Sequence, residues 1–213
     1  MDLFSQLLTS ADADSRFYGV AIAIVTNNQD PKGWGRVKVK LPWMSNEVES
    51  DWARLVMPMA GKQRGFFFLP EVDDEVLVAF EHGNPQALYI LGALWNGEDK
   101  PPESNADGKN NVRTIKSRSG HVIRLTDKAG EEKIEIIDKS AKNSVVISTK
   151  DNTITLTAEG DITLTSTKGK LKLEGQQGVE ITSQASIKVE ASENMDLKAG
   201  PQLNIKGQMV DIN

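Results

Sequence analysis

Few side chains in this sequence could do acid–base or metal chemistry, and their spacing does not favour it. The two histidines, His82 and His121, are far apart, and neither has a second ligand at metal-binding spacing. The acidic residues within 71–75 lie between Pro70 and Val76, which is typical of a solvated loop before a strand. The chain has no Cys, no Gly-rich phosphate loop and no nucleophile elbow. We therefore expect no catalytic residues, no cofactor and no metal, and we interpret the protein as a non-enzyme.

Three consecutive aromatic residues, Phe66–Phe68, could instead stack on the bases of a nucleic acid. A formal net charge of −5 and the lack of a basic cluster are unfavourable for that ligand, so we expect no nucleic-acid partner. A strand that is buried on one face and packs on a neighbouring chain with the other face would also explain the three rings.

A repeat dominates the C-terminal part of the sequence. From Ile154 onward, seven consecutive segments follow an eight-residue pattern, and one of them has an extra residue. Positions one and three are aliphatic or Met, positions two and four are polar, and position five is small. This alternation predicts a short half-buried strand, and the remaining turn-forming residues predict a corner. The apolar positions, which we expect to face inward, are Ile154, Leu156, Ile162, Leu164, Leu171, Leu173, Val179, Ile181, Ile187, Val189, Met195, Leu197, Leu203 and Ile205.

Two stacked β architectures fit such a repeat. If one chain wound around itself, seven units would give barely two coils, fewer than the roughly three repeats that such stacks need. If three chains wound around one axis, each unit would pair with units of its two neighbours. We prefer this intertwined triple-stranded β-helix, a rod on the order of 40 Å long for strands about 4.8 Å apart. An ordinary β-sandwich would vary its strand lengths, and the full occupancy of both apolar positions argues against disorder.

The N-terminal residues 1–16 are predicted to form a short amphipathic helix. Its apolar residues are Leu3, Phe4, Leu7 and Leu8, which fall on one face. The helix could pack on its own domain or serve as a docking segment for another protein. The start lacks the features of a signal peptide, and no apolar run of about 18 residues occurs, so we expect cytoplasmic synthesis without a signal and no membrane span.

Residues 17–96 are predicted to form a five-stranded barrel of the oligonucleotide/oligosaccharide-binding (OB) type. Its five strands are marked by Val20, Ile22 and Ile24, by Val37, Val39 and Leu41, by residues 52–57, by Val76, Val78 and Phe80, and by Leu88, Ile90 and Gly92. Residues 97–112 are rich in Pro, Gly, Asn and charge, and form a linker. Neck strands follow in residues 113–147, and the β-helix shaft in residues 148–213. The predicted fold class is therefore all-β, with a barrel, a trimeric β-helix and a short N-terminal helix.

The segment Arg64–Gly97, RGFFFLPEVDDEVLVAFEHGNPQALYILGALWNG, resembles the barrel of the central spike of contractile injection machines. These are the V-type spikes of phage baseplates and the VgrG proteins of type VI secretion. The segment Ile115–Ile136 is similar to the neck of the same family. The resemblance covers residues 17–213 and implies a homotrimer whose barrels sit under the tail tube.

The resemblance further implies a structural cell-puncturing spike, which transmits the force of sheath contraction and touches the target membrane only transiently. We expect it in a phage tail or another contractile injection particle. The sequence holds no hub domain before the barrel and no lysozyme domain, so a separate baseplate hub or tail-tube protein is expected as a partner. No His occurs in the last forty residues, so the apical metal site of some phage spikes is not expected, and a separate PAAR-like protein would bind the tip.

Two other functions stay open. The barrel could be a binding module for a glycan or a single-stranded nucleic acid on a β-helical stalk, which basic and aromatic residues on one barrel face would favour. An enzyme on a β-helix scaffold, such as a polysaccharide lyase, would need a charged cluster on a wide sheet face. Units of eight residues leave too little surface for that cluster.

Overall fold

The structure is a computed structural model that describes residues 16–44 and 49–211. The predicted N-terminal helix, with Leu3, Phe4, Leu7 and Leu8, lies outside the described residues except for its last position. Within the described residues the chain is all-β, as predicted, apart from the single 3₁₀ turn η2 (Glu81–Gly83).

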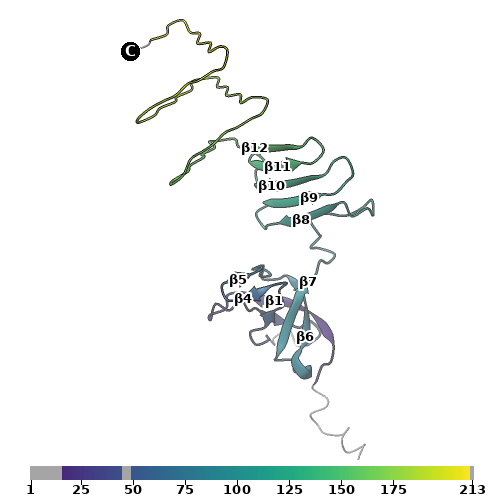
Figure 1. Cartoon of the computed structure of the whole chain (residues 1–213). Helices are drawn as coiled ribbons and strands as arrows, with labels where there is room; N and C mark the ends of the chain where they lie inside the picture. Colours follow the sequence, from purple (N-terminus) through teal and green to yellow (C-terminus); the bar gives the residue numbers. More distant parts are fainter. Residues whose placement is uncertain (1–15, 45–48, 212–213) are drawn as a thin grey trace, which may run out of the picture. The chain divides into compact units, whose positions relative to one another are not determined.

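The chain divides into two compact units, residues 1–159 and 160–213. The first unit contains two five-stranded sheets and a small two-stranded hairpin (Figure 1).

The first sheet has the strand order β2-β1-β6-β7-β3, and all its neighbours are antiparallel except β3 and β7. The two edge strands of this sheet are β2 and β3. The residues that precede them, Val37 and Ala53, exchange backbone hydrogen bonds of 3.0 and 2.8 Å. The sheet therefore closes into a five-stranded barrel with the features of an OB domain. The strands, with the hairpin β4–β5, are β1 (Val20–Asn27), β2 (Lys38–Lys40), β3 (Arg54–Leu55), β4 (Ala60–Gly61), β5 (Arg64–Gly65), β6 (Glu75–Phe80) and β7 (Leu88–Ala93).

The barrel is held together by a core of small and branched aliphatic side chains. Its buried members are Ala23, Val25, Val37, Val39, Leu41, Ala53, Val76, Val78, Leu88 and Ile90. Alternation buries Val39 of β2, Val76 and Val78 of β6, and Leu88 and Ile90 of β7, as the sequence pattern indicates. Leu91, on the other face of β7, is exposed.

Strand β1 differs from the pattern used to identify it. The sequence marked Val20, Ile22 and Ile24 as its apolar alternation, yet Val20 and Ile22 are 59% and 47% exposed. Ala23 and Val25 are buried instead, because they are the register partners of the inward Val76 and Val39. Since both faces of β1 are apolar, only the pairing with its neighbours decides which face enters the core.

The second sheet is an antiparallel meander in which each strand pairs with the next one along the chain, in the order β12-β11-β10-β9-β8. Its registers run without a shift. The strands are β8 (Val112–Lys116), β9 (Val122–Thr126), β10 (Lys133–Ile137), β11 (Ser144–Ser148) and β12 (Thr153–Thr157). The last of them, β12, is the strand of the first eight-residue repeat.

The second unit, residues 160–213, contains no strand in its described part up to residue 211. Its chain bends sharply at regular intervals, beginning with the bend that ends the first repeat. The bends lie at residues 159–160, 167–169, 176–177, 184–185, 192–193, 200–201 and 208. Each of them falls on the turn positions of one repeat, where the corners are predicted. The stretches between corners have no strand partner within the described part of this chain.

Candidate functional site

One face of the meander is apolar across all five strands. Because side chains alternate between the two faces of a strand, residues in register lie side by side on the same face. One row consists of Ile115, Ile123, Ile136, Val145 and Leu156, and the next consists of Arg113, Leu125, Ile134, Ile147 and Ile154. We call the nine apolar members of these two rows the apolar ladder.

The apolar ladder is open to solvent in the single chain. Its isoleucines and leucines are between 40% and 73% exposed, from Leu125 and Ile147 at the lower end to Ile154 at the upper. A contiguous apolar face of this kind on a folded protein marks an interaction site.

The opposite, polar face of the same sheet is the one that the chain covers itself. Glu103 of the linker accepts hydrogen bonds from Thr114 Oγ1 at 2.9 Å and from Arg124 Nη2 at 2.9 Å. The hydrogen bond from Thr114, followed by the contacts with Arg124, lowers the pKa of Glu103. Glu135 is only 7% exposed on this face, where its Oε1 accepts a hydrogen bond from Lys133 Nζ at 3.0 Å. The sheet therefore shelters its polar face and exposes its apolar face. A monomer would be stabilised by the opposite arrangement, with the apolar face buried.

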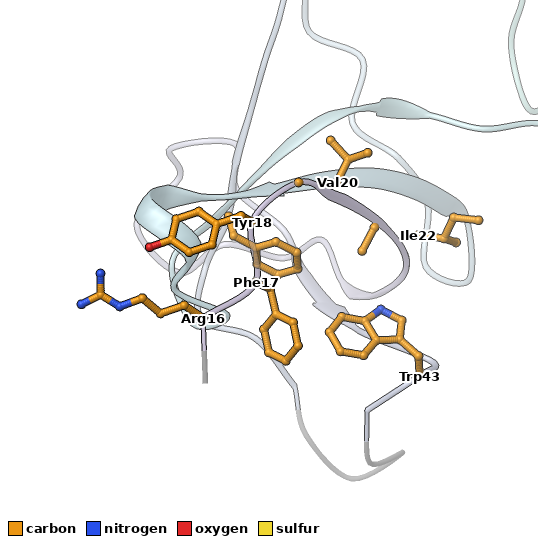
Figure 2. Close-up of a pocket in the computed structure, with 9 residues that line it drawn as sticks. Arg16, Phe17, Tyr18, Val20, Ile22 and Trp43 are labelled. Carbon is orange, nitrogen blue, oxygen red and sulfur yellow. The ribbon is translucent and has the colours of Figure 1, made fainter. Parts of the chain in front are cut away.

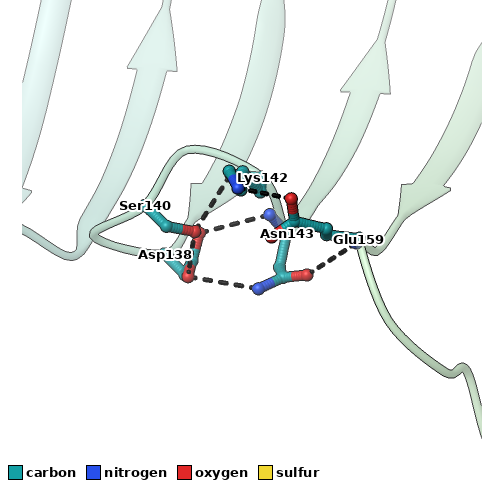
Figure 3. Close-up of polar contacts among 5 residues, drawn as sticks. All are labelled: Asp138, Ser140, Lys142, Asn143 and Glu159. Atoms are coloured by element: carbon teal, nitrogen blue, oxygen red, sulfur yellow. Dashed lines mark hydrogen bonds and ion pairs between the residues drawn. The ribbon is translucent and has the colours of Figure 1, made fainter.

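Loop contacts fix the end of the meander (Figure 3). Asp138, in the turn between β10 and β11, accepts hydrogen bonds from Ser140 Oγ at 2.7 Å and from the backbone N–H of Asn143 at 3.2 Å. The side chain of Asn143 in turn accepts a hydrogen bond from the backbone N–H of Glu159 at 3.1 Å. Lys142 forms an ion pair with the Glu159 carboxylate. This turn therefore holds Glu159, in the corner that leads from the first repeat into the next one.

The contacts of Asp138 predict a pH dependence. They lower its pKa from 3.8 to about 2, with the Ser140 hydrogen bond as the largest cause. Because the folded pKa is depressed, the stabilisation is complete above about pH 4 and is lost as the pH falls towards 2. We expect Asp138→Asn to lower the melting temperature at pH 5, and the difference from wild type to shrink as the pH falls to 2. Thermal melts followed by circular dichroism at stepped pH test this, and a difference that stays constant over that window would contradict it.

The fourteen repeat positions predicted to face inward are all exposed in the single chain, between 46% and 73%. Ile154 and Leu156 lie in β12 and extend the apolar ladder, and the other twelve lie in the second unit. An inward orientation needs neighbouring chains, so it stays a prediction. The meander and the repeats nevertheless carry the same alternation of apolar and polar positions on consecutive segments.

The barrel carries a second apolar feature, a groove of about 610 Å³ at the start of β1 (Figure 2). Phe17 packs edge-on against Trp43 with ring centroids 4.7 Å apart, and lies 5.9 Å from the ring of Phe80. Val20 and Ile22 line the same groove with their outward side chains. The groove includes the first described residues, which follow the predicted docking segment in the sequence.

The two histidines are engaged in local structure. His121 Nδ1 accepts a hydrogen bond from the backbone N–H of Lys139 at 3.2 Å, and His82 has a positive φ of 50° within η2. In the described ranges, no three His, Cys, Asp or Glu residues are grouped as metal ligands would be. Nor does any helix in that part of the chain have the length and apolarity needed to cross a membrane.

Residues 21–95, most of the barrel, match the family described as the type VI secretion system/phage-baseplate injector OB domain. The barrel is therefore an OB domain of this injector class.

Proteins with similar sequences include spike proteins of the type VI secretion system. The chain is 32% identical over 128 residues to the type VI secretion system spike protein VgrG3 of Vibrio cholerae, covering 54% of this chain and 13% of that protein. It is 31% identical over 144 residues to the spike protein VgrG1a of Pseudomonas aeruginosa, covering 60% of this chain and 22% of that protein. A further similar protein, at 32% identity over 108 residues, is the actin cross-linking toxin VgrG1 of Vibrio cholerae, of which the chain covers 10%.

These matches support the resemblance of the sequence to VgrG-like baseplate spike proteins. The chain spans at most 22% of the length of the three relatives described above.

Proposed function

We propose that three copies of this chain form the cell-puncturing spike of a contractile injection particle, either a phage tail or a secretion machine. In this proposal residues 17–96 form the barrel, 97–112 the linker, 113–147 the neck and 148–213 the shaft. The protein is structural and catalyses no reaction.

The proposal rests on the exposure of apolar side chains in the C-terminal half of the chain. The apolar ladder and the fourteen repeat positions are exposed in one chain, while corners recur at every repeat. Three such chains around an axis would bury these side chains in one continuous core, and the strand segments that lack partners would pair between chains. Each Ile, Leu or Val that becomes buried contributes about 1.5–3 kcal/mol before ordering costs.

Such a core suits a part that must carry force. Strands that lie across the axis and pair between chains resist splaying, and a buried apolar interior excludes water along the length. The many apolar positions in three chains would make unfolding slow, which is the relevant kind of stability for a rod used once. The polar second and fourth positions would face solvent and let the rod pass through an envelope.

The partners follow from the same proposal. A hub or tail-tube protein would hold the barrel end, through residues 1–16 with Leu3, Phe4, Leu7 and Leu8. A PAAR-like protein would cap the C-terminal tip, and contact with the target membrane would be transient. Phe17 of the groove follows this attachment segment directly in the sequence, so the groove would lie near the hub.

Deleting residues 1–16 tests the attachment. We expect the shortened chain to remain a trimer, because the apolar ladder and repeats are untouched, and to lose at least tenfold in affinity for the hub. Co-purification with the hub and light scattering of the free protein measure the two properties. Loss of the trimer instead would show that this segment belongs to the core.

The puncturing function is tested in assembled particles. Particles from cells that lack this chain should contract without permeabilising target cells, as read by entry of an impermeant dye, and the wild-type chain should restore entry. Purified protein incubated with envelope polysaccharide should release no soluble sugar. Undiminished dye entry without the chain, or sugar release by the purified protein, would contradict the proposal.

A further inference from the structure

Basic and aromatic side chains alternate on the outer surface of the barrel. Lys32 Nζ lies over the Trp34 ring at 4.9 Å, and the Arg36 guanidinium lies 4.8 Å from the same ring. Arg36 also lies 5.8 Å from the ring of Trp52, over which Lys38 Nζ lies at 5.6 Å. These four contacts join residues from two separate parts of the sequence into one series of cation–π interactions.

The strand pairing explains why these residues meet. Val37, Val39 and Ala53 face the core, so their neighbours in sequence face outward. The bridge between Val37 and Ala53 then sets Lys38 beside Trp52 and Arg36 beside Arg54. Arg54 continues the series onto β7, where its Nη2 donates to the Tyr89 hydroxyl at 2.6 Å. We call Lys32, Trp34, Arg36, Lys38, Trp52 and Arg54 the cation–aromatic band.

The band is locally positive on an acidic chain. Its four cations are accompanied by two carboxylates, Asp30 and Glu49, which leaves a local charge of +2 on a chain whose formal net charge is −5. Asp30 is fully committed to Arg36, with its side chain 2% exposed, whereas the Glu49 side chain is 40% exposed beside Lys38. An anionic ligand that also offers hydroxyl donors would complement this mixture of groups.

The same contacts favour a sugar polymer over a nucleic acid. Single-strand binding by stacking uses several exposed rings in series. Of the two indoles of the band, Trp34 is exposed and Trp52 is partly buried. The exposed Glu49 carboxylate can accept from hydroxyl donors, which every sugar residue of a glycan offers and a DNA backbone lacks. OB barrels bind oligosaccharides as well as oligonucleotides, by the surface of strands two and three and the loop between strands one and two. The band occupies this surface.

We propose that the cation–aromatic band binds an acidic glycan, a sugar chain bearing carboxylates. Lys32 and Arg54 would pair with carboxylates of the glycan, Glu49 would accept from its hydroxyls, and the indole of Trp34, which is 68% exposed, would pack on its C–H surfaces. This binding goes beyond the puncturing function and does not rest on it.

The test measures binding of the full-length protein to alginate oligosaccharides, a uronic-acid probe, by titration calorimetry. Dextran serves as the neutral glycan and a 20-nucleotide oligo(dT) as the nucleic acid. Trp34→Ala should weaken alginate binding at least tenfold. Trp95→Ala is the matched control, because Trp95 is 69% exposed outside the band and should not change the affinity. Lys32→Gln keeps both indoles and should weaken binding and reduce its dependence on salt.

Alginate binding that is lost in Trp34→Ala and kept in Trp95→Ala would support the proposal. Equal binding of dextran, tighter binding of oligo(dT), equal losses in both Trp variants or no binding of alginate would each overturn it. None of these results depends on whether particles puncture cells, so this proposal and the puncturing function fail separately.

Discussion

Replacing Ile181 by Asp is expected to abolish the heat-resistant trimer. Ile181 is the third position of the fourth repeat and is 68% exposed in the single chain. In a shared core, one substitution places three carboxylates close together at the axis. The variant would lose about 1.5–3 kcal/mol per chain of apolar burial, and the cost of burying unpaired charges adds to this loss. Light scattering and gel mobility without boiling measure the trimer.

The neighbouring residue supplies the control for this variant. Thr182 is the polar fourth position of the same repeat, and Thr182→Asp introduces the same charge on the predicted outer face. It should leave the trimer and its heat resistance unchanged. If Ile181→Asp is also a heat-resistant trimer, or if both variants are equally damaged, the inward assignment of the apolar positions is wrong.

A comparable loss is expected for Ile136→Asp in the centre of the apolar ladder. Ile136 is 52% exposed in the single chain, and its register partners are Ile123 and Val145. A monomer would tolerate Asp at a half-exposed position, whereas a trimer would bury three charges on its apolar face. We expect dissociation or a fall of at least ten degrees in melting temperature. Differential scanning calorimetry at fixed protein concentration measures it, because assembly makes the melting temperature depend on concentration.

A substitution at Thr155 is the control for Ile136→Asp. Thr155 lies on the opposite face of the same sheet and is exposed at the end strand β12. Thr155→Asp should melt like the wild type. A normal melting curve for Ile136→Asp would mean that the apolar ladder stays in contact with solvent in the assembled protein.

Much of the barrel and the meander could be predicted from the sequence, because their strands alternate cleanly. Val39 of β2, Val76 and Val78 of β6, and Leu88 and Ile90 of β7 are buried as their alternation indicates, and every repeat corner lies on its turn residues. The inward face of β1 could not be predicted, since Val20–Val25 is apolar on both faces and only the partners Val39 and Val76 decide between them.

The surface features could be recognised only from the fold. Trp34 and Trp52 lie in different loops, so both rings reach their common cation Arg36 only when the barrel closes beside Val37 and Ala53. Lys32, Arg36 and Lys38 do lie within seven residues of the sequence, a short basic segment that the net charge of −5 masks. Arg54 joins them only in the fold. The covering of the polar sheet face by Glu103 likewise depends on how the linker folds back, which alternation in the strands cannot indicate.

The molar mass of the purified protein in solution tests the central claim most directly. Three chains of 23.3 kDa give about 70 kDa, and light scattering after size exclusion distinguishes this value from that of one chain. The account predicts a single species of about 70 kDa that does not dissociate on dilution. A folded, stable species of 23.3 kDa would contradict it, because one chain would then have to keep its apolar ladder and its repeats in water.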